Sequence, residues 1–371
     1  MLTCPAPWSA VPKRMMRFAI VPVLLGAACL FACTAQEETD TTAAEESPSL
    51  RHADEVHLAD IHQLTRGGQN AEAYFSSDGT QLIFQAMRDS MECDQIFTMT
   101  VDGAQQAMVS SGMGRTTCAF FAPDGGSIVY ASTYLGGNAC PPPPDHSQGY
   151  VWAVYAAFDI FRADPDGGNL VRLTDAPGYD AEAVYSHDGS RILFTSARDG
   201  DLELYSMRPD GSDVTRLTHA VGYDGGGFYS PDDSLICWRA DRRTDSAGIR
   251  DFQDLLAQEL IRPGNLELYV MRADGSEQRR VSDLGAANFC PYFTPDGRRL
   301  IFSSNHHSDT KREFDLFVIN LDGTELQQIT FTPEFDGFPM FSPDGTKLVW
   351  CSNRHGTVRG ETNVFIADWV E

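Results

Sequence analysis

Six copies of one short turn-and-strand pattern recur along this chain of 371 residues. In the clearest copy, Ser342, Pro343, Asp344 and Gly345 precede an apolar run that ends at Trp350. Proline presets φ for the first corner of a type I turn, and glycine takes the left-handed position that closes a bulged hairpin. The apolar run that follows is typical of a strand buried on both faces. Six such copies predict a repeated β-structure.

Each copy has the same spacing. The turn aspartates are Asp78, Asp124, Asp188, Asp232, Asp296 and Asp344. An aromatic residue stands six positions after each of them, at Phe84, Tyr130, Phe194, Trp238, Phe302 and Trp350. In the first five copies a second strand with its own Asp-Gly turn follows, and then a short strand that ends in a pattern such as Leu217–Thr218. The unit is therefore four strands in roughly 45 residues, which is typical of a propeller blade.

The two ends of the chain complete one unit. The sixth copy stops at Glu371 without a fourth strand, whereas residues 60–65 carry a fourth-strand ending and precede the first complete unit. Pairing the two ends would close the ring and remove an exposed strand edge. The predicted fold is an all-β, six-bladed β-propeller closed by its N-terminal strand, with one short helical insertion.

Residues 58–371 also resemble a known repeat family. The Ser-Pro-Asp-Gly turns, the Ser-x-Arg that follows the apolar run and the Leu-Thr ending look like the repeats of TolB-type propellers, and residues 186–218 are the most similar stretch. The resemblance implies a propeller of the bacterial envelope. By analogy with TolB, which binds a peptidoglycan-associated lipoprotein, it implies binding rather than catalysis.

The N-terminal region has the features of a targeting segment. Lys13, Arg14 and Arg17 precede an apolar stretch over residues 18–31 that is too short to span a membrane. The stretch ends before Ala32 and Cys33 in a pattern that resembles the bacterial lipobox, although a plain secretory signal remains an alternative. We therefore predict a lipoprotein signal over 1–32, with lipidation at Cys33 and a location at the outer membrane. We predict that residues 33–56 form a disordered acidic tether and that residues 57–371 form the propeller.

Blade topology indicates which end of the propeller carries function. The turns between first and second strands and between third and fourth strands lie at one end and are tight. The connections between second and third strands and between blades lie at the other end and are longer. Because loops on a rigid scaffold usually carry binding, we expect the end with the long connections, here called the loop end, to be the functional one.

Two insertions at the loop end supply candidate residues. In the second blade, residues 133–158 contain four consecutive prolines, followed by Asp145, His146, Tyr150 and Trp152. In the fourth blade, apolar residues over 247–261 have helical spacing. Both insertions could pack over the channel mouth, and the aromatic residues could instead form a ligand platform.

Further candidates recur at fixed repeat positions. Glu72 and Glu182 stand six residues before a turn aspartate and are expected near the channel mouth. Arginine or histidine follows each second strand except that of the second blade, at Arg88, Arg198, Arg242, His306 and Arg354, with His307 next to His306. The regular spacing favours salt bridges between blades, although Asp145, His146, His306, His307 and Glu182 could also converge on a metal or an acidic ligand. No tight ligand spacing supports that alternative, so we predict neither a metal centre nor a cofactor.

The cysteine positions allow one disulfide, but they do not determine which two cysteines form it. Cys237 and Cys351 lie in apolar strands and are expected to be buried thiols. Cys93, Cys118 and Cys140 belong to the first two blades at the loop end, and in an oxidising envelope two of them can pair. We predict Cys118–Cys140, although connectivity does not follow from sequence.

The net charge and the absence of known catalytic motifs argue against several classes of function. The net charge of −24 argues against a protein that tracks nucleic-acid phosphates. The sequence has no Gly-x-Ser-x-Gly, phosphate-loop or Cys-x-x-Cys motif. We predict a monomeric, non-enzymatic binding propeller, anchored to a membrane by lipid, whose partner is an envelope protein or polymer. Two alternatives remain: a metal-dependent polysaccharide lyase of the oligogalacturonate type, with His146, His306, His307 and His355 as ligand candidates, and an accessory or sensor subunit of an envelope peptidase or transporter.

Overall fold

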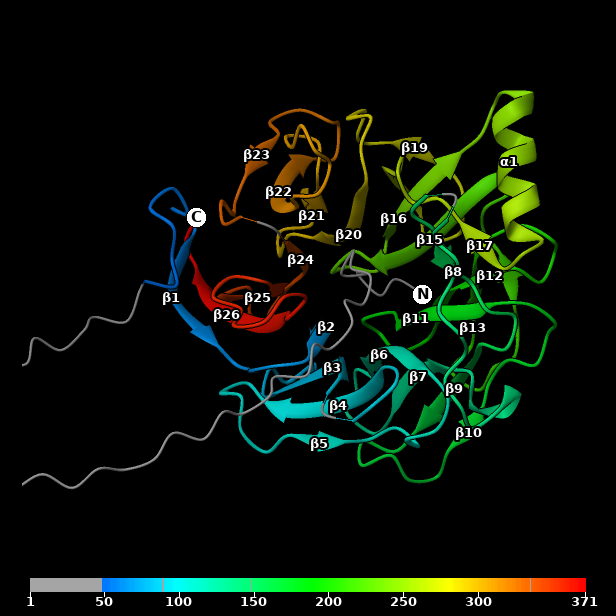
Figure 1. The fold of residues 1–371 in the computed structure, drawn as a ribbon, viewed down its shortest axis with the longest axis horizontal. Helices are drawn as coiled ribbons and strands as arrows, with labels where there is room; N and C mark the ends of the chain where they lie inside the picture. The colour runs from blue at the N-terminus through cyan, green and yellow to red at the C-terminus, as the bar shows by residue number, and fades with distance from the viewer. Residues whose placement is uncertain (1–48, 89, 148, 334) are drawn as a thin grey trace, which may run out of the picture. The chain divides into compact units, whose positions relative to one another are not determined.

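The computed structural model describes residues 49–371, apart from residues 89, 148 and 334. These residues form six four-stranded antiparallel sheets arranged around a common centre (Figure 1). The innermost strand of each sheet contacts the innermost strands of its neighbours. The predicted six-bladed propeller is therefore confirmed.

The blades follow the predicted order, with strands numbered along the chain. Blade 1 contains β2 (Gln69–Phe75), β3 (Gln81–Met87), β4 (Gln95–Thr100) and β5 (Ala107–Met108). Blade 2 contains β6 (Thr116–Phe121), β7 (Ile128–Ser132), β9 (Asp159–Ala163) and β10 (Val171–Arg172). Blade 3 contains β11 (Asp180–Tyr185), β12 (Ile192–Ser196), β13 (Glu203–Met207) and β14 (Thr215–Arg216).

The remaining blades have the same form. Blade 4 contains β15 (Gly222–Tyr229), β16 (Leu235–Arg242), β18 (Glu267–Arg272) and β19 (Arg279–Arg280). Blade 5 contains β20 (Asn288–Phe293), β21 (Arg299–Ser304), β22 (Asp315–Asn320) and β23 (Gln327–Gln328). Blade 6 contains β24 (Asp336–Phe341), β25 (Lys347–Ser352) and β26 (Asn363–Trp369), and its fourth strand is β1 (Leu58–Gln63).

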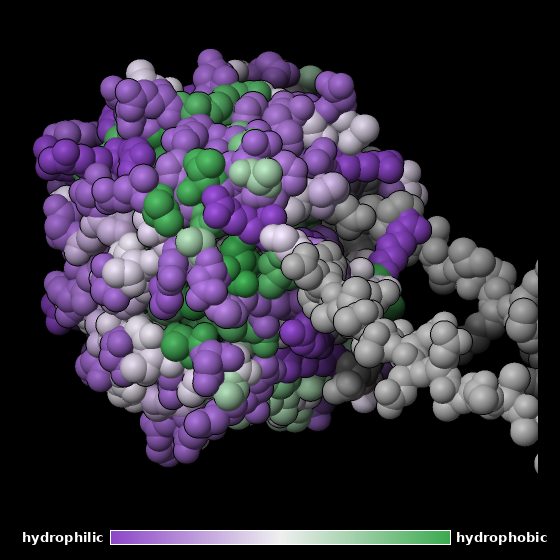
Figure 2. Space-filling model, turned by 90° about the vertical axis from the view of Figure 1, so that its left-hand side faces the viewer, coloured by the Kyte–Doolittle hydropathy of each residue, from purple (hydrophilic) through white to green (hydrophobic). Residues whose placement is uncertain are grey.

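Strand β1 closes the ring as expected. It pairs antiparallel with β26, with Leu58 opposite Trp369 and Gln63 opposite Phe365. The two termini of the propeller thus share one sheet, and β26 is not left as an exposed edge. Figure 2 shows the side of the molecule that carries β1, where green apolar atoms form small separate groups among purple polar atoms.

The propeller begins earlier than the sequence indicated. Residues 50–56, assigned to the tether, pack against blade 6 instead. Glu55 is fully buried and its carboxylate binds the Arg354 guanidinium, with an Nη2–Oε1 distance of 2.9 Å. His52 stacks on the ring of Phe331. The predicted signal over 1–32, Cys33 and most of the tether lie outside the described residues.

All six innermost strands contain a bulge at the same position. The pairing register shifts around residues 72, 118, 182, 226, 290 and 338. Each of these residues has φ between +50° and +59°, although only Gly226 is a glycine. A bulge re-aims one side chain in an otherwise regular strand.

The two insertions were predicted only in part. The helix α1 (Ser246–Leu256) starts at Asp245, whose side chain accepts bonds from the amides of Ala247 and Gly248. It ends earlier than expected, because residues 260–261 form strand β17 (Leu260–Ile261). In the blade 2 insertion, a short turn η1 (Tyr134–Gly136) precedes β8 (Trp152–Ala153). Within the described residues, no helix has the length and apolar character needed to cross a membrane.

Candidate functional site

The loop end of the propeller is covered by the two insertions, which meet each other. Strand β8 of blade 2 pairs with β17 of blade 4, with Trp152 opposite Ile261. The Trp152 ring also packs edge-on against Phe289 of β20, with ring centroids 6.5 Å apart. Since blades 2 and 5 lie on opposite sides of a six-membered ring, the blade 2 insertion reaches across the end of the channel. We call residues 133–158 and 246–261 together the cap.

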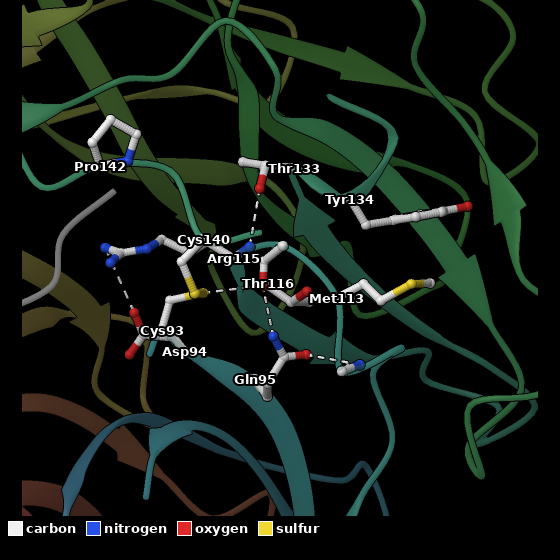
Figure 3. The surroundings of a disulfide bond; sticks show 12 residues. Cys93, Asp94, Gln95, Met113, Arg115, Thr116, Thr133, Tyr134, Cys140 and Pro142 are labelled. Atoms are coloured by element: carbon white, nitrogen blue, oxygen red, sulfur yellow. Dashed lines mark hydrogen bonds and ion pairs between the residues drawn. A yellow bond between two sulfur atoms is a disulfide. The ribbon is translucent and has the colours of Figure 1, made fainter. Parts of the chain in front are cut away.

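A disulfide fixes the cap to blade 1. Cys93, in the connection between β3 and β4, pairs with Cys140 of the cap (Figure 3). Arg115 and the buried Asp94 lie beside this bond. The predicted pair Cys118–Cys140 is therefore wrong. Cys118 stands at the bulge of β6 and is a buried thiol outside the disulfide that lines a cavity in the channel. Cys237 and Cys351 are buried thiols, as predicted.

Beneath the cap, the bulge residues line a small cavity in the channel. Glu72, Cys118, Glu182 and Cys290 surround it, together with Arg239 of blade 4. The cavity has a volume of about 30 Å³. This is room for one or two water molecules and far below the roughly 300–1,000 Å³ of typical small-molecule sites.

The two channel glutamates differ in environment. Glu182 accepts hydrogen bonds from Arg239 Nη2, from the Tyr223 hydroxyl and from Thr195 Oγ1, the last at 2.7 Å. Glu72 is buried beside the thiol of Cys118, and burial raises the pKa of its carboxyl to about 7. Burial also raises the pKa of the Cys118 thiol well above its usual value. The cluster therefore combines one ion pair with a carboxyl group that can be neutral near pH 7.

Aromatic side chains close the channel below the cavity. Tyr74 of blade 1, Phe120 of blade 2 and Phe228 of blade 4 contact one another, with centroids 5.6–6.2 Å apart. Phe228 also contacts Tyr292 of blade 5. Tyr74 and Phe228 of this layer also line the cavity, so aromatic rings bound it on that side.

The cap presents an ordered aromatic group on its outer side. Tyr150 is 46% exposed, and its hydroxyl accepts a hydrogen bond of 2.7 Å from Trp152 Nε1. The His146 ring stacks on Tyr150, with centroids 5.8 Å apart. Asp145 precedes His146 and its carboxylate binds Ser147. The structure therefore brings together His146, Tyr150 and Trp152, while the mostly buried Trp152 serves to hold Tyr150 in place.

The repeated arginines form clamps within blades rather than the salt bridges between blades that we expected. Each guanidinium lies over aromatic rings of its own second and third strands and bonds a residue of its own innermost strand. The bonded pairs are Arg88–Asn70, Arg198–Asp180, Arg242–Asp224 and Arg354–Asp336. This pairing arises because the loop after the second strand turns back over the same sheet. These four side chains do not converge on a common site.

In blade 5 the position of these arginines is held by a histidine. His306 packs edge-on against Phe317, with centroids 4.5 Å apart, and its backbone amide bonds Ser304 Oγ. The adjacent His307 points to Asp315 at the start of β22, with an Nε2–Oδ2 distance of 2.9 Å. Burial lowers the pKa of both imidazoles, and it raises the pKa of the Asp315 carboxyl to about 8.

The histidines and carboxylates proposed as a metal set are not brought together. Glu182 lies in the channel and His146 on the cap, whereas His307 lies in blade 5. Among the described residues, the group of three potential ligands consists of His307, Glu313 and Asp315. Of the four histidines considered for a lyase, it contains only His307.

Sequence reasoning missed three residues that matter to these clusters. Arg239 fills the space of the bulge side chain that Gly226 lacks, and the glycines at 225–227 were the available signal. Asp315 opens β22 at a repeat position held by Glu203 and Glu267 in other blades. Glu313 gave no signal, because the connection between second and third strands differs in length from blade to blade, so the residue stands at no fixed repeat position.

A further hollow, of about 320 Å³, lies at the opposite end of the propeller, between the turns of blades 4 and 5. Its carboxylates, Asp232 and Asp296, already accept bonds from Ser230 and Thr294 of their own turns. The hollow is the wedge between two adjacent turns and offers few groups for a ligand.

No model of a known protein family matches the sequence. Among solved structures, a putative TolB from Agrobacterium tumefaciens is 19% identical with a TM-score of 0.55, and the match covers 84% of this chain and 97% of that one. TolB from Acinetobacter baumannii is 18% identical with a TM-score of 0.52, and the match covers 81% of this chain but only 64% of that one. An oligogalacturonate lyase in complex with manganese is 14% identical with a TM-score of 0.50, over 84% and 93% of the two chains.

At these identities the comparisons establish the fold alone. The six sheets, the closure by β1 and the similarity to both TolB structures agree with one another. The chain is a six-bladed β-propeller whose fold is similar to that of the two TolB structures.

Proposed function

We propose that this chain is a non-enzymatic binding propeller of the bacterial cell envelope, held at a membrane by a lipid on Cys33, and that it engages a protein partner through the outer surface of the cap. The observation that carries the proposal is the fixed aromatic group of His146 and Tyr150. It lies on a cap that is tied to blade 1 by the Cys93–Cys140 bond and to blade 4 by β17.

This group has the properties of a binding hot spot. Tyrosine provides a large contact area at low entropic cost, and it is enriched where protein partners meet. The hydrogen bond from Trp152 fixes the Tyr150 hydroxyl before a partner arrives, which reduces the ordering cost of binding. The small volume of the channel cavity supports contact at the surface rather than capture of a substrate inside the ring.

The Cys93–Cys140 disulfide supports a location in the cell envelope. Structural disulfides persist in oxidising compartments, such as the bacterial periplasm and the cell surface. A lipid on Cys33 would place the propeller in such a compartment. Metabolic labelling with palmitate tests the anchor: wild type should incorporate label and Cys33→Ser should not. Equal labelling of both chains would remove the anchor from the proposal.

Site-specific photo-crosslinking in intact cells tests the binding surface. A photoreactive phenylalanine at position 150 should give a discrete crosslinked envelope protein. The same residue at position 346, in a tight turn at the opposite end, is the matched control and should give none. Crosslinks from position 346 alone would contradict the proposal. Co-sedimentation with peptidoglycan without a protein crosslink would replace the protein partner by a polymer.

A further inference from the structure

The first residue of each third strand is polar and bonds a residue in the fourth strand of its blade or just after that strand. Outside blade 5, three of these residues are carboxylates. Each pairs with the arginine that stands two positions before the threonine or serine at the end of the fourth-strand pattern, as Arg216 stands before Thr218. The distances are 2.8 Å for Asp159–Arg172, 2.7 Å for Glu203–Arg216 and 3.1 Å for Glu267–Arg280. A buried carboxylate at this position is thus normally compensated by a cation.

Blade 5 breaks this rule. Its carboxylate, Asp315, is 1% exposed, but the arginine position holds Gln328, whose Nε2 donates a bond of 2.9 Å to Asp315 Oδ2. Thr330 Oγ1 donates to the other oxygen at 3.1 Å. A neutral amide and a hydroxyl satisfy the hydrogen bonds of the carboxylate but supply no positive charge. The Asp336 carboxylate lies close by, although Arg354 pairs with it.

Two metal-binding side chains from the β21–β22 loop meet at this uncompensated carboxylate. Ligand atoms of His307, Glu313 and Asp315 all lie within 4.8 Å of one another. Zinc bonds of about 2.0–2.2 Å place tetrahedral ligand atoms roughly 3.3 Å apart, so small side-chain rotations would close the set. His307 is 24% exposed at its side chain, which gives an ion access from solvent.

We propose that His307, Glu313 and Asp315 bind a divalent transition-metal ion of the zinc or manganese type. The ion supplies the positive charge that arginine supplies in blades 2, 3 and 4. One imidazole with two carboxylates suits these metals, whereas calcium prefers a shell of oxygen atoms alone. Three protein ligands leave coordination positions open to solvent or to a partner group. Lys311 of the same loop is a competing cation, and its Nζ bonds the His306 carbonyl.

Metal titration of the purified, chelator-treated full chain by calorimetry tests the proposal, with Zn²⁺, Mn²⁺ and Ca²⁺ examined separately. We expect one Zn²⁺ or Mn²⁺ per chain and an affinity loss of about 100-fold or more in His307→Ala and Asp315→Asn. His219→Ala, an exposed histidine of blade 3, is the matched control and should bind as wild type does.

The decisive variant is Gln328→Arg, which restores the arginine of the repeat and is expected to fold normally. Its guanidinium should form an ion pair with the Asp315 carboxylate and abolish metal binding. Added zinc should therefore raise the melting temperature of wild type but not of this variant. Wild-type affinity in Gln328→Arg, equal loss in His219→Ala and His307→Ala, binding of Ca²⁺ alone, or no binding to wild type would each overturn the proposal.

Discussion

Arg239 of blade 4 donates a charge-assisted hydrogen bond to Glu182 of blade 3 inside the channel. Both side chains are more than nine-tenths buried. The pair joins the innermost region of two neighbouring blades at the channel cavity. Because each charge depends on the other, the pair fixes how these two blades meet.

We predict that removing one partner destabilises the protein strongly. Glu182→Met leaves the Arg239 charge buried without its ion-pair partner, which costs roughly 3–5 kcal/mol of the free energy of unfolding. The double variant Glu182→Met with Arg239→Met should recover most of that loss, because an apolar pair needs no compensation. Urea unfolding of wild type, Glu182→Met, Arg239→Met and the double variant gives the values. A single variant within about 0.5 kcal/mol of wild type would show that the charges are not coupled.

Gly226 should tolerate no side chain while Arg239 is present. A methyl group at position 226 would overlap Nη1 of Arg239. The positive φ is not the obstacle, since Glu72, Cys118 and Glu182 hold similar angles in their own blades. We expect Gly226→Ala to lower the free energy of unfolding by about 3 kcal/mol or more, because the added methyl group overpacks the site. The same substitution in an Arg239→Met background should lower it much less.

Thermal unfolding of both backgrounds measures the difference. Gly264→Ala is the control, because a methyl group there meets nothing within 4 Å, and it should change stability by less than about 0.5 kcal/mol. An equal loss from Gly226→Ala in both backgrounds would assign the cost to the backbone instead of Arg239.

Glu72 makes stability depend on pH. Burial raises the pKa of its carboxyl from 4.5 to about 7, with Cys118, Glu182 and Arg239 as charged or polar neighbours. Between these values the unfolded chain is ionised while the folded chain keeps its proton. This group therefore lowers the free energy of unfolding as pH rises from about 4.5 to 7, by roughly 3 kcal/mol at most.

Glu72→Gln removes this dependence. Relative to wild type, the variant should become more stable as pH rises from 5 to 8, as measured by urea unfolding at both values. Glu325→Gln, which changes an exposed carboxylate, should follow the wild-type profile. A constant difference between Glu72→Gln and wild type across this range would contradict the raised pKa.

The sequence predicted the fold better than the contacts within it. The spacing from Asp344 to Trp350 encodes a turn and a buried strand, so counting copies was enough to count blades. Ring closure followed because residues 60–65 carry the ending that the last blade lacks. Such local patterns repeat, and repetition makes them readable in a single sequence.

Contacts between segments distant in sequence could not be derived in the same way. Arg198 and Asp180 stand at fixed repeat positions, but whether they pair within a blade depends on the path of a loop. Cys140 lies in an insertion without a repeat counterpart, so its disulfide partner depends on where the cap packs against the blades. The charge deficit at Asp315 becomes visible only when the strands of different blades are compared in space.

The Cys93–Cys140 bond should govern the cap and not the ring. Cys140→Ser removes a crosslink between residues separated by 47 positions, and such crosslinks typically contribute about 2–4 kcal/mol. Because β8, β17 and the buried side chains of α1 still hold the cap, we expect the six blades to remain folded while residues 137–150 become sensitive to proteolysis. Cys118→Ala is the control: it leaves the disulfide intact, so thiol counting under non-reducing conditions should still show one bond. Rapid cleavage of the cap in Cys118→Ala, with resistance in Cys140→Ser, would mean that the cap is tied to the channel thiol instead.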